Sequence, residues 1–134
     1  MIAFIDPSEQ AAAAERGQTP PADQPTTPSG LFPCGPIVNS HGIQDWIDSG
    51  HTDPNFDEVE RILEIGTALF RHLAGDWGDL DAEDTESNND ALQDGSRLFS
   101  AYQLERAGKI WIITEAADDA GNRAATTILF PSEY

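Results

Sequence analysis

An acidic tract between Asp76 and Asp94 holds the side chains of this 134-residue chain that are best suited to binding or catalysis. It contains eight carboxylates and no Lys or Arg: Asp76, Asp79, Asp81, Glu83, Asp84, Glu86, Asp90 and Asp94. Such a single-sign patch opposes folding through self-repulsion unless solvent, a cation or a basic partner offsets it. The tract therefore indicates hydration, cation binding or docking on a basic surface.

Docking on a basic surface is the interpretation that we favour. Carboxylates spaced along a helix can imitate nucleic-acid phosphates, which lie about 1.7 Å apart along a duplex axis when both strands are counted. The expected partner is a basic nucleic-acid-binding protein, such as a nuclease or a CRISPR or restriction complex. The residues expected to bind it are Glu83, Asp84, Glu86, Asp90, Asp94, Asp118 and Asp119. The alternative is a solvated helix face that only keeps the chain soluble.

Two cation-binding interpretations use the same tract. An EF-hand count places four carboxylates at positions one, three, five and twelve: Asp79, Asp81, Glu83 and Asp90. Position six is Asp84 rather than Gly, and position twelve is Asp rather than Glu, so we expect a chance match on a helix. We expect no metal site and no cofactor. A divalent-metal-dependent hydrolase using Asp76, Asp79 and Asp81 is kept as a second alternative function.

The residues that could support nucleophilic catalysis or zinc binding are scattered. Cys34, the only cysteine, has no catalytic signature around it and is expected to be a small buried side chain. His41, His51 and His72 lack the paired spacing of zinc ligands. We expect His72 to end a helix, where the helix dipole favours it. The sequence therefore predicts no catalytic residue.

The overall charge excludes some partners. Seven Lys and Arg against 24 Asp and Glu give a net charge of −17, which should repel nucleic acid and anionic lipid. Phe99, Tyr102 and Trp111 are therefore expected to pack in the core rather than to stack on bases. The chain has no signal peptide and no apolar run of about 20 residues. These features favour a cytoplasmic protein that binds neither nucleic acid nor membrane.

The elements that position the acidic tract begin after a Pro- and Ala-rich segment. Residues 1–31 are expected to be a flexible extension, because they bury too little apolar area to offset the entropy of ordering. Met1–Ile5 is apolar and short, and it could dock as an edge strand. Residues 32–134 are expected to form a single α+β domain.

Three helices are predicted in the first part of this domain. A short strand at Ile37 and Val38 precedes a helix over 42–48 that Gly50 ends. Asp53 and Pro54 are expected to open a second helix that runs to Gly75. After a connector in which Trp77 and Leu80 are the structural anchors, Asp81 is expected to cap a third helix over 82–94. Its apolar residues are few: Ala82, Ala91 and Leu92.

After Gly95 the apolar residues no longer recur at helical spacing but alternate with other residues, as in a strand. Strands are predicted over 97–104, 109–115 and 125–130, with a polar loop over 116–123. Tyr102 and Trp111 are the expected structural side chains of the first two. We therefore predict an α+β fold, with about three helices packed on a C-terminal antiparallel meander of three to four strands.

The second half contains six segments with a distinctive sequence: Gly75–Leu80, Asp90–Leu92, Gly95–Leu98, Ser100–Tyr102, Lys109–Ala116 and Ala125–Tyr134. In these segments the chain resembles a family of short uncharacterised proteins encoded on bacterial plasmids and genomic islands. The resemblance covers about half the chain, and residues 35–48 match more loosely. The family usually begins near Phe32, and its loop at 116–123 is shorter and less acidic. The resemblance implies a bacterial cytoplasmic protein carried by mobile DNA, and it implies no activity.

The combined expectation is a binding protein rather than an enzyme. Mobile elements commonly carry small acidic proteins that block host defence nucleases, and the acidic tract fits an inhibitor or decoy of that kind. The first alternative is a non-inhibitory structural or regulatory accessory protein that could dimerise through its sheet edge. The sequence leaves the oligomeric state and the identity of the partner open.

Overall fold

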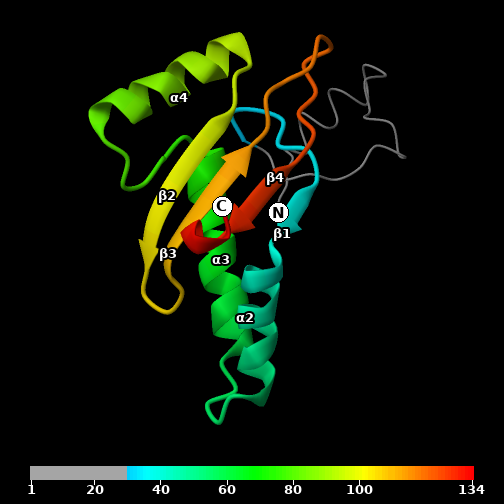
Figure 1. The fold of residues 1–134 in the computed structure, drawn as a ribbon, viewed down its shortest axis with the longest axis vertical. Coiled ribbons are helices and arrows are strands. Elements are labelled where there is room, and N and C mark those ends of the chain that lie inside the picture. Colours follow the sequence, from blue (N-terminus) through cyan, green and yellow to red (C-terminus); the bar gives the residue numbers. More distant parts are fainter. Residues whose placement is uncertain (1–29) are drawn as a thin grey trace, which may run out of the picture.

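A computed structural model describes residues 30–134, which form one α+β unit. Figure 1 shows α2 and α3 side by side on one face of a four-stranded sheet, and α4 at the end of the sheet near the start of β2. The helices are α2 (His41–Thr52), α3 (Glu58–Leu73) and α4 (Ala82–Asp94). The strands are β1 (Ile37–Asn39), β2 (Leu98–Leu104), β3 (Gly108–Thr114) and β4 (Thr126–Leu129). A short 3₁₀ turn, η1 (Pro131–Glu133), follows β4.

The sheet has the order β1-β4-β3-β2. β2, β3 and β4 form the predicted antiparallel meander, with a short turn between β2 and β3 and a longer loop between β3 and β4. β1 pairs with β4 in parallel, with Ile37 opposite Thr126. The α+β class, the three helices and the C-terminal strands are therefore confirmed, but the prediction of a purely antiparallel sheet is wrong. The parallel pair arises because three helices and the β2–β3 hairpin separate β1 from β4, so β4 returns to the sheet in the direction of β1.

The core lies between α2, α3 and the covered face of the sheet. Alternate residues of the strands point toward the helices, as the period of two requires. Tyr102 of β2, Ile112 of β3 and Ile128 of β4 pack there against Ile43 of α2 and Ile65 of α3. A second cluster under α4 contains Phe32, Cys34, Leu73, Trp77, Ala91 and Leu98.

The start of α3 corrects the sequence prediction. α2 continues through Gly50 to Thr52, because the Cβ-free surface of Gly50 lets the backbone of Glu58 approach closely. Asp53 ends α2 rather than opening α3, and its carboxylate accepts a hydrogen bond from the Asn55 amide at 2.8 Å. That local turn keeps Pro54 out of the helix, and α3 begins at Glu58.

His72 corrects the sequence prediction in a different way. It lies in the last turn of α3, as expected, but its side chain is completely buried instead of facing solvent at the helix end. The rings of Phe32 and Trp77 flank it, with centroid distances of 5.4 and 5.6 Å. Polar partners on β2 and β3, rather than the helix dipole, account for its position.

The expected edge strand at Met1–Ile5 lies outside the described residues, and so does most of the predicted extension. Leu31, at the other end of that extension, donates its amide to the Leu73 carbonyl at 2.9 Å. In the described part of the chain, no helix has the length and apolar character needed to cross a membrane.

Candidate functional site

The acidic tract divides into two structural parts. Asp76 and Asp79 lie in the connector between α3 and α4, whereas Asp81 caps α4 by accepting the Asp84 amide at 2.8 Å. The other carboxylates of the tract belong to α4, which runs the full predicted length and ends at Gly95 in the left-handed conformation. The predicted boundaries of this helix are therefore confirmed.

The connector is held by structural contacts. Asp76 accepts two hydrogen bonds from Arg71, the shorter at 2.7 Å, and a third from the Gly78 amide. The bonds from Arg71 are the main reason why the pKa of Asp76 lies below its ordinary value. Gly78 forms a parallel bridge with Ala101, so the connector covers the outer edge of β2. Trp77 is buried, and Leu80 is only partly buried.

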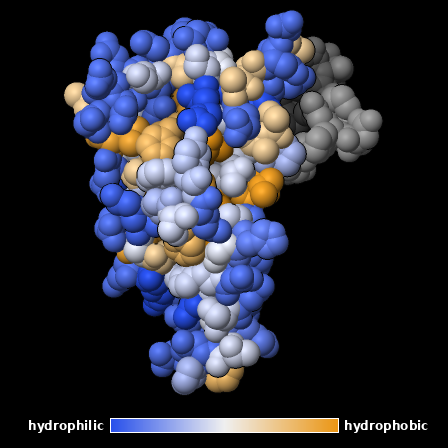
Figure 2. Space-filling model, in the orientation of Figure 1, coloured by the Kyte–Doolittle hydropathy of each residue, from blue (hydrophilic) through white to orange (hydrophobic). Residues whose placement is uncertain are grey.

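The outward face of α4 carries a row of four carboxylates. Glu83, Glu86, Asp90 and Asp94 recur at intervals of three and four residues, so they lie along one side of the helix, and all four are exposed. We call them the α4 carboxylate row. It spans about 16 Å along the axis at 1.5 Å per residue. Figure 2 shows the region of α4 as a hydrophilic band at the upper edge of the molecule.

The inward face of α4 is fixed to the sheet mainly by polar contacts. Asn88 is buried, and its side chain donates to the Phe99 carbonyl at 2.6 Å and accepts from the Phe99 amide at 3.1 Å. Asn89 accepts a hydrogen bond from the Trp77 indole at 3.1 Å. Ala91 is buried as well, whereas Ala82, an apolar residue of the expected inward stripe, is exposed.

Asn88 is a positioning residue that the sequence reasoning missed. Its spacing from Ala91 and Leu92, three and four residues, is the only sequence signal that places it on the inward face. With two backbone bonds to β2, Asn88 holds the α4 carboxylate row in a fixed orientation toward solvent.

Arg123 is a second missed residue, and it supports the C-terminal end of α4. Its guanidinium is buried and donates to three backbone carbonyls, those of Ser96 at 2.8 Å, Glu115 at 2.9 Å and Ala91 at 3.3 Å. Burial lowers the pKa of Arg123, and the nearby Asp94 opposes that shift. A cation at this position offsets the negative end of the helix dipole.

The seven predicted partner-binding carboxylates differ in their surroundings. Glu83, Asp84, Glu86, Asp90 and Asp119 are exposed, and their carboxylates accept no hydrogen bond from another described residue. Asp94 accepts from the Ser96 amide at 2.8 Å, and hydrogen bonding to Ser96 lowers its pKa. Asp118 accepts from the amides of Ala120 and Asn122. These last two therefore also shape their loops.

The loop at 116–123 meets the C-terminal end of α4. The Ala117 amide donates to the Gly95 carbonyl at 2.7 Å. Asp118 and Asp119 follow directly, so the structure brings them to the end of the helix where Asp94 lies.

Comparison with known proteins adds nothing to this geometry. No family model, curated protein or solved structure matches this chain significantly. The site is therefore interpreted from its own residues.

The residues considered for metal binding or catalysis do not converge. Among residues 30–134, no three His, Cys, Asp or Glu side chains are grouped so that they could hold a metal ion. Asp76 is engaged by Arg71 and Asp81 by the start of α4. Cys34 is buried, which raises the pKa of its thiol. His41 lies at the start of α2. His51 lies at the end of α2, where its Nδ1 is 3.4 Å from the carboxylate of Glu58.

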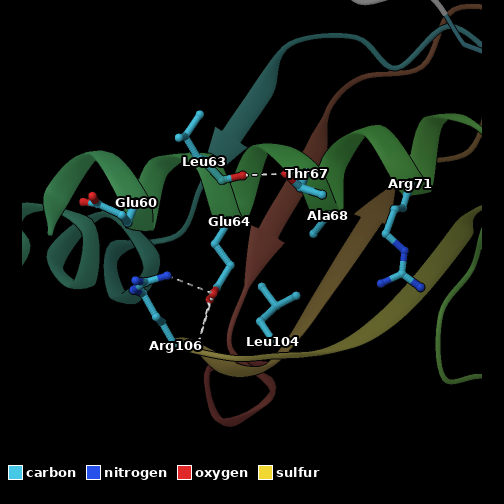
Figure 3. A pocket seen from close by; sticks show the side chains of 8 residues that line it. All are labelled: Glu60, Leu63, Glu64, Thr67, Ala68, Arg71, Leu104 and Arg106. Carbon is cyan, nitrogen blue, oxygen red and sulfur yellow. Dashed lines mark hydrogen bonds and ion pairs between the residues drawn. The ribbon is translucent and has the colours of Figure 1, made fainter.

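Two hollows of the described surface are well defined, and neither contains a set of catalytic side chains. The larger, about 330 Å³, lies between α3 and the β2–β3 turn. Figure 3 shows Glu64 directed across it to Arg106, whose amide lies 3.0 Å from the carboxylate. The smaller, about 200 Å³, lies on the uncovered face of the sheet between Phe99, Trp111 and Tyr134. Trp111 is half-buried there, whereas Tyr102 is buried on the opposite face.

Proposed function

We propose that this protein is an acidic decoy that docks the α4 carboxylate row on the basic, nucleic-acid-binding surface of another protein. The observation that carries the proposal is the unequal pairing of charges. Among the described residues, no Lys, Arg or His lies within 4.0 Å of a carboxylate of α4. The negative charge of α4 therefore has no ion-pair partner within the described structure and is available to another protein.

The acidic residues around α2 and α3 show the contrast. Arg61 contacts Asp57 at 3.0 Å and Asp53 at 3.4 Å. Arg106 lies 3.7 Å from Asp57 and 4.0 Å from Glu64. Arg61 and Arg106 thus pair with carboxylates near the start of α3, whereas no base pairs with a carboxylate of α4 among the described residues.

The charge spacing on α4 suits the proposed role. Five carboxylates lie on a helix of 13 residues, which is about one charge per 4 Å of axis at 1.5 Å per residue. One strand of DNA carries a phosphate about every 3.4 Å along the axis, and the duplex carries one every 1.7 Å. The five carboxylates of α4 therefore approximate the charge spacing of a single strand more closely than that of a duplex.

The row also weakens the helix that carries it. Glu86 and Asp90 are four residues apart, and so are Asp90 and Asp94. Like charges at this spacing destabilise a helix by about 0.2–0.5 kcal/mol per pair. A surface that costs stability, and whose only internal hydrogen bond among the described residues is that of Asp94 with Ser96, fits a binding site. The mobile-element context suggested by the sequence resemblance makes a host defence complex the partner class that we propose.

The proposal is tested by comparing two triple variants that have the same net charge. The first, Glu83→Gln/Glu86→Gln/Asp90→Asn, neutralises the row. The second, Asp45→Asn/Glu60→Gln/Glu105→Gln, removes three exposed charges from α2, α3 and the β2–β3 turn. The immobilised wild-type protein should capture basic proteins from a bacterial lysate at low salt, and high salt or added DNA should release them. The second variant should capture the same proteins, and the first should not.

Equal capture by both triple variants would refute the decoy proposal. It would show that only net charge matters, or that another surface binds. The accessory-protein alternative, in which the acidity serves solubility, would then be favoured. Circular dichroism and urea unfolding of each variant establish that loss of capture does not come from unfolding.

A further inference from the structure

The outward face of α3 is apolar although nothing in the described structure covers it. Val59 and Leu63 are each 62% exposed, Phe70 is 64% exposed and Ile62 is 48% exposed. The opposite face of the same helix is also apolar, and it supplies Ile65, Ala68 and Leu73 to the core. A helix that is apolar on both faces is typical of a helix covered on both faces.

The exposed stripe continues into the turn before α3. Phe56 is 74% exposed and has a φ of 48°, a left-handed conformation that is unusual for an aromatic residue. Phe56, Val59, Leu63, Gly66 and Phe70 follow one another at alternating intervals of three and four residues. This is the spacing of a helix surface that contacts another segment along its length.

Gly66 lies in the middle of the stripe and leaves a gap in it. No atom lies within 4 Å of the position that a Cβ of this residue would occupy. Glycine lowers helix stability relative to alanine, and no contact in the described structure requires it here. The gap gives a large side chain of the covering segment a place between Leu63 and Phe70.

The undescribed part of the chain begins at the end of this same helix. Gly30 is the first described residue, and a Cβ on it would lie 2.7 Å from the carbonyl oxygen of Leu73, the last residue of α3. Leu31 donates its amide to the same carbonyl at 2.9 Å. Residues 1–29 are therefore attached directly beside the exposed stripe.

Residues 1–29 contain one cluster of large apolar side chains that could cover the stripe. Apart from Ala and Pro, the apolar side chains of residues 1–29 are Met1, Ile2, Phe4 and Ile5. All four lie at the far end of the segment. We propose that Met1–Ile5 packs on the outward face of α3 in the same molecule, over Val59, Leu63 and Phe70.

The length of the connection fits this arrangement. Residues 6–30 are 25 in number, and a chain of that length reaches up to roughly 80 Å. α3 has 16 residues and is about 24 Å long. The connection is therefore long enough for Met1–Ile5 to reach any part of the outward face of α3.

Charge favours this occupant over a second copy of the chain. Two copies would each bring a net charge of −17 to the interface, and like charges oppose association. Met1–Ile5 has no charged side chain, so it adds no repulsion to the acidic residues beside the stripe. Glu58 and Glu60 lie there in the first turn of α3.

A nitroxide spin label on the full-length protein tests the proposal. The Ala3→Cys substitution places the label inside Met1–Ile5 and keeps all four large apolar side chains, while the buried Cys34 is protected from labelling. We expect at least a twofold loss of NMR signal intensity for the amides of Val59, Leu63 and Phe70, and no loss for Asn88 of α4. The loss should persist on dilution.

Two matched variants examine the contact itself. Leu63→Gln should restore the α3 signals, whereas Val38→Gln, on the exposed strand β1, should leave the signal loss unchanged. Unaffected α3 signals in the labelled protein would overturn the proposal. Signal loss confined to β1 would also overturn it, in favour of an edge strand. Loss seen only when labelled protein is mixed with unlabelled, isotope-enriched protein would overturn it in favour of a second copy.

Discussion

His72 is the residue whose chemistry is most changed by the fold. Its Nδ1 lies 2.5 Å from the Ser100 hydroxyl and its Nε2 lies 2.9 Å from the Thr114 hydroxyl. Thr114 is in turn 2.7 Å from Thr126, which donates to the Cys34 carbonyl at 2.7 Å. These contacts form one continuous chain of buried polar groups.

The direction of each bond in this chain follows from the number of hydroxyl protons. Thr126 uses its only proton on Cys34, so Thr114 must donate to Thr126. Thr114 then has no proton left for His72, and Nε2 of His72 must be the donor. Nδ1 therefore accepts from Ser100, and the buried imidazole is neutral with its proton on Nε2.

We predict that His72 is the Nε2–H tautomer at neutral pH. A long-range ¹H–¹⁵N correlation spectrum should show a protonated Nε2 and an unprotonated Nδ1. The opposite pattern would mean that the hydroxyl chain runs the other way, with Thr126 not donating to Cys34.

The same burial predicts a pH dependence of stability. Burial, with a smaller contribution from Arg123, lowers the pKa of His72 from its ordinary value of 6.5 to about 4. The unfolded chain thus binds this proton more readily than the folded one. Stability is fully present above pH 6.5 and is lost as the pH falls toward 4, by about 3 kcal/mol in total.

The measurement is urea unfolding at several pH values for the wild type and for His72→Gln. The carboxylates with lowered pKa values, Asp76, Asp94 and Glu133, are present in both proteins. Their contributions cancel in the difference. The wild type should lose about 3 kcal/mol more than the variant between pH 6.5 and pH 4. Parallel curves would contradict the burial of a neutral His72.

At the scale of elements, α4 depends on contacts outside itself. Asn88 attaches it to β2, and Arg123 from a distant loop binds its last carbonyls. The helix has few apolar residues and repeated like charges, so it would be a weak helix in isolation.

Asp90→Asn should stabilise the protein. The substitution removes two like-charge pairs, with Glu86 and with Asp94, and should raise the free energy of unfolding by about 0.5 kcal/mol at low salt. Asp94→Asn removes only one pair and weakens the hydrogen bond to the Ser96 amide, so it should not stabilise. Urea unfolding at low and high salt measures both, and a gain for Asp90→Asn that does not shrink with salt would exclude the electrostatic cause.

The connector before α4 requires glycine at one position. Gly78 has a φ of 76°, and a Cβ on it would lie 2.0 Å from the Ala101 carbonyl oxygen. Gly78→Ala should therefore cost more than the roughly 1–2 kcal/mol of a left-handed conformation alone. Gly108→Ala is the matched control, because Gly108 has a φ of 78° and open space around it. Equal losses in thermal or urea unfolding would show that the connector moves to accommodate the methyl group.

At the scale of the whole molecule, charge is distributed unevenly. Arg61 and Arg106 pair with carboxylates near the start of α3, while α4 has no ion pair among the described residues. Solvation and screening by salt are therefore the main means by which the free protein offsets its α4 charge.

Added sodium chloride should stabilise the protein, because screening reduces repulsion among the excess carboxylates more than it weakens the few ion pairs. Urea unfolding should give a free energy that rises from low to moderate ionic strength. The rise should be smaller in Glu83→Gln/Glu86→Gln/Asp90→Asn. A fall with salt would mean that the ion pairs of Arg61 and Arg106 dominate the electrostatic free energy.

The sequence by itself determined the local features of this protein. The helix over 82–94, its Asp81 cap and its Gly95 end follow from residues adjacent in the chain, and the alternation in β2 and β3 follows from a period of two. Such features depend on interactions within a few residues, so the pattern of residue types is sufficient to predict them. The exposure of the α4 carboxylate row follows in the same way.

Only the tertiary structure decided which distant segments meet. The parallel pairing of β1 with β4, the burial of His72 between Phe32 and Trp77, and the support of α4 by Asn88 and Arg123 all join residues far apart in sequence. A polar side chain, which sequence alone would place at the surface, can be buried when the fold supplies its hydrogen-bond partners. For the same reason the sequence did not show that the outward face of α3 is exposed, because its residues have the same pattern as a buried apolar helix face.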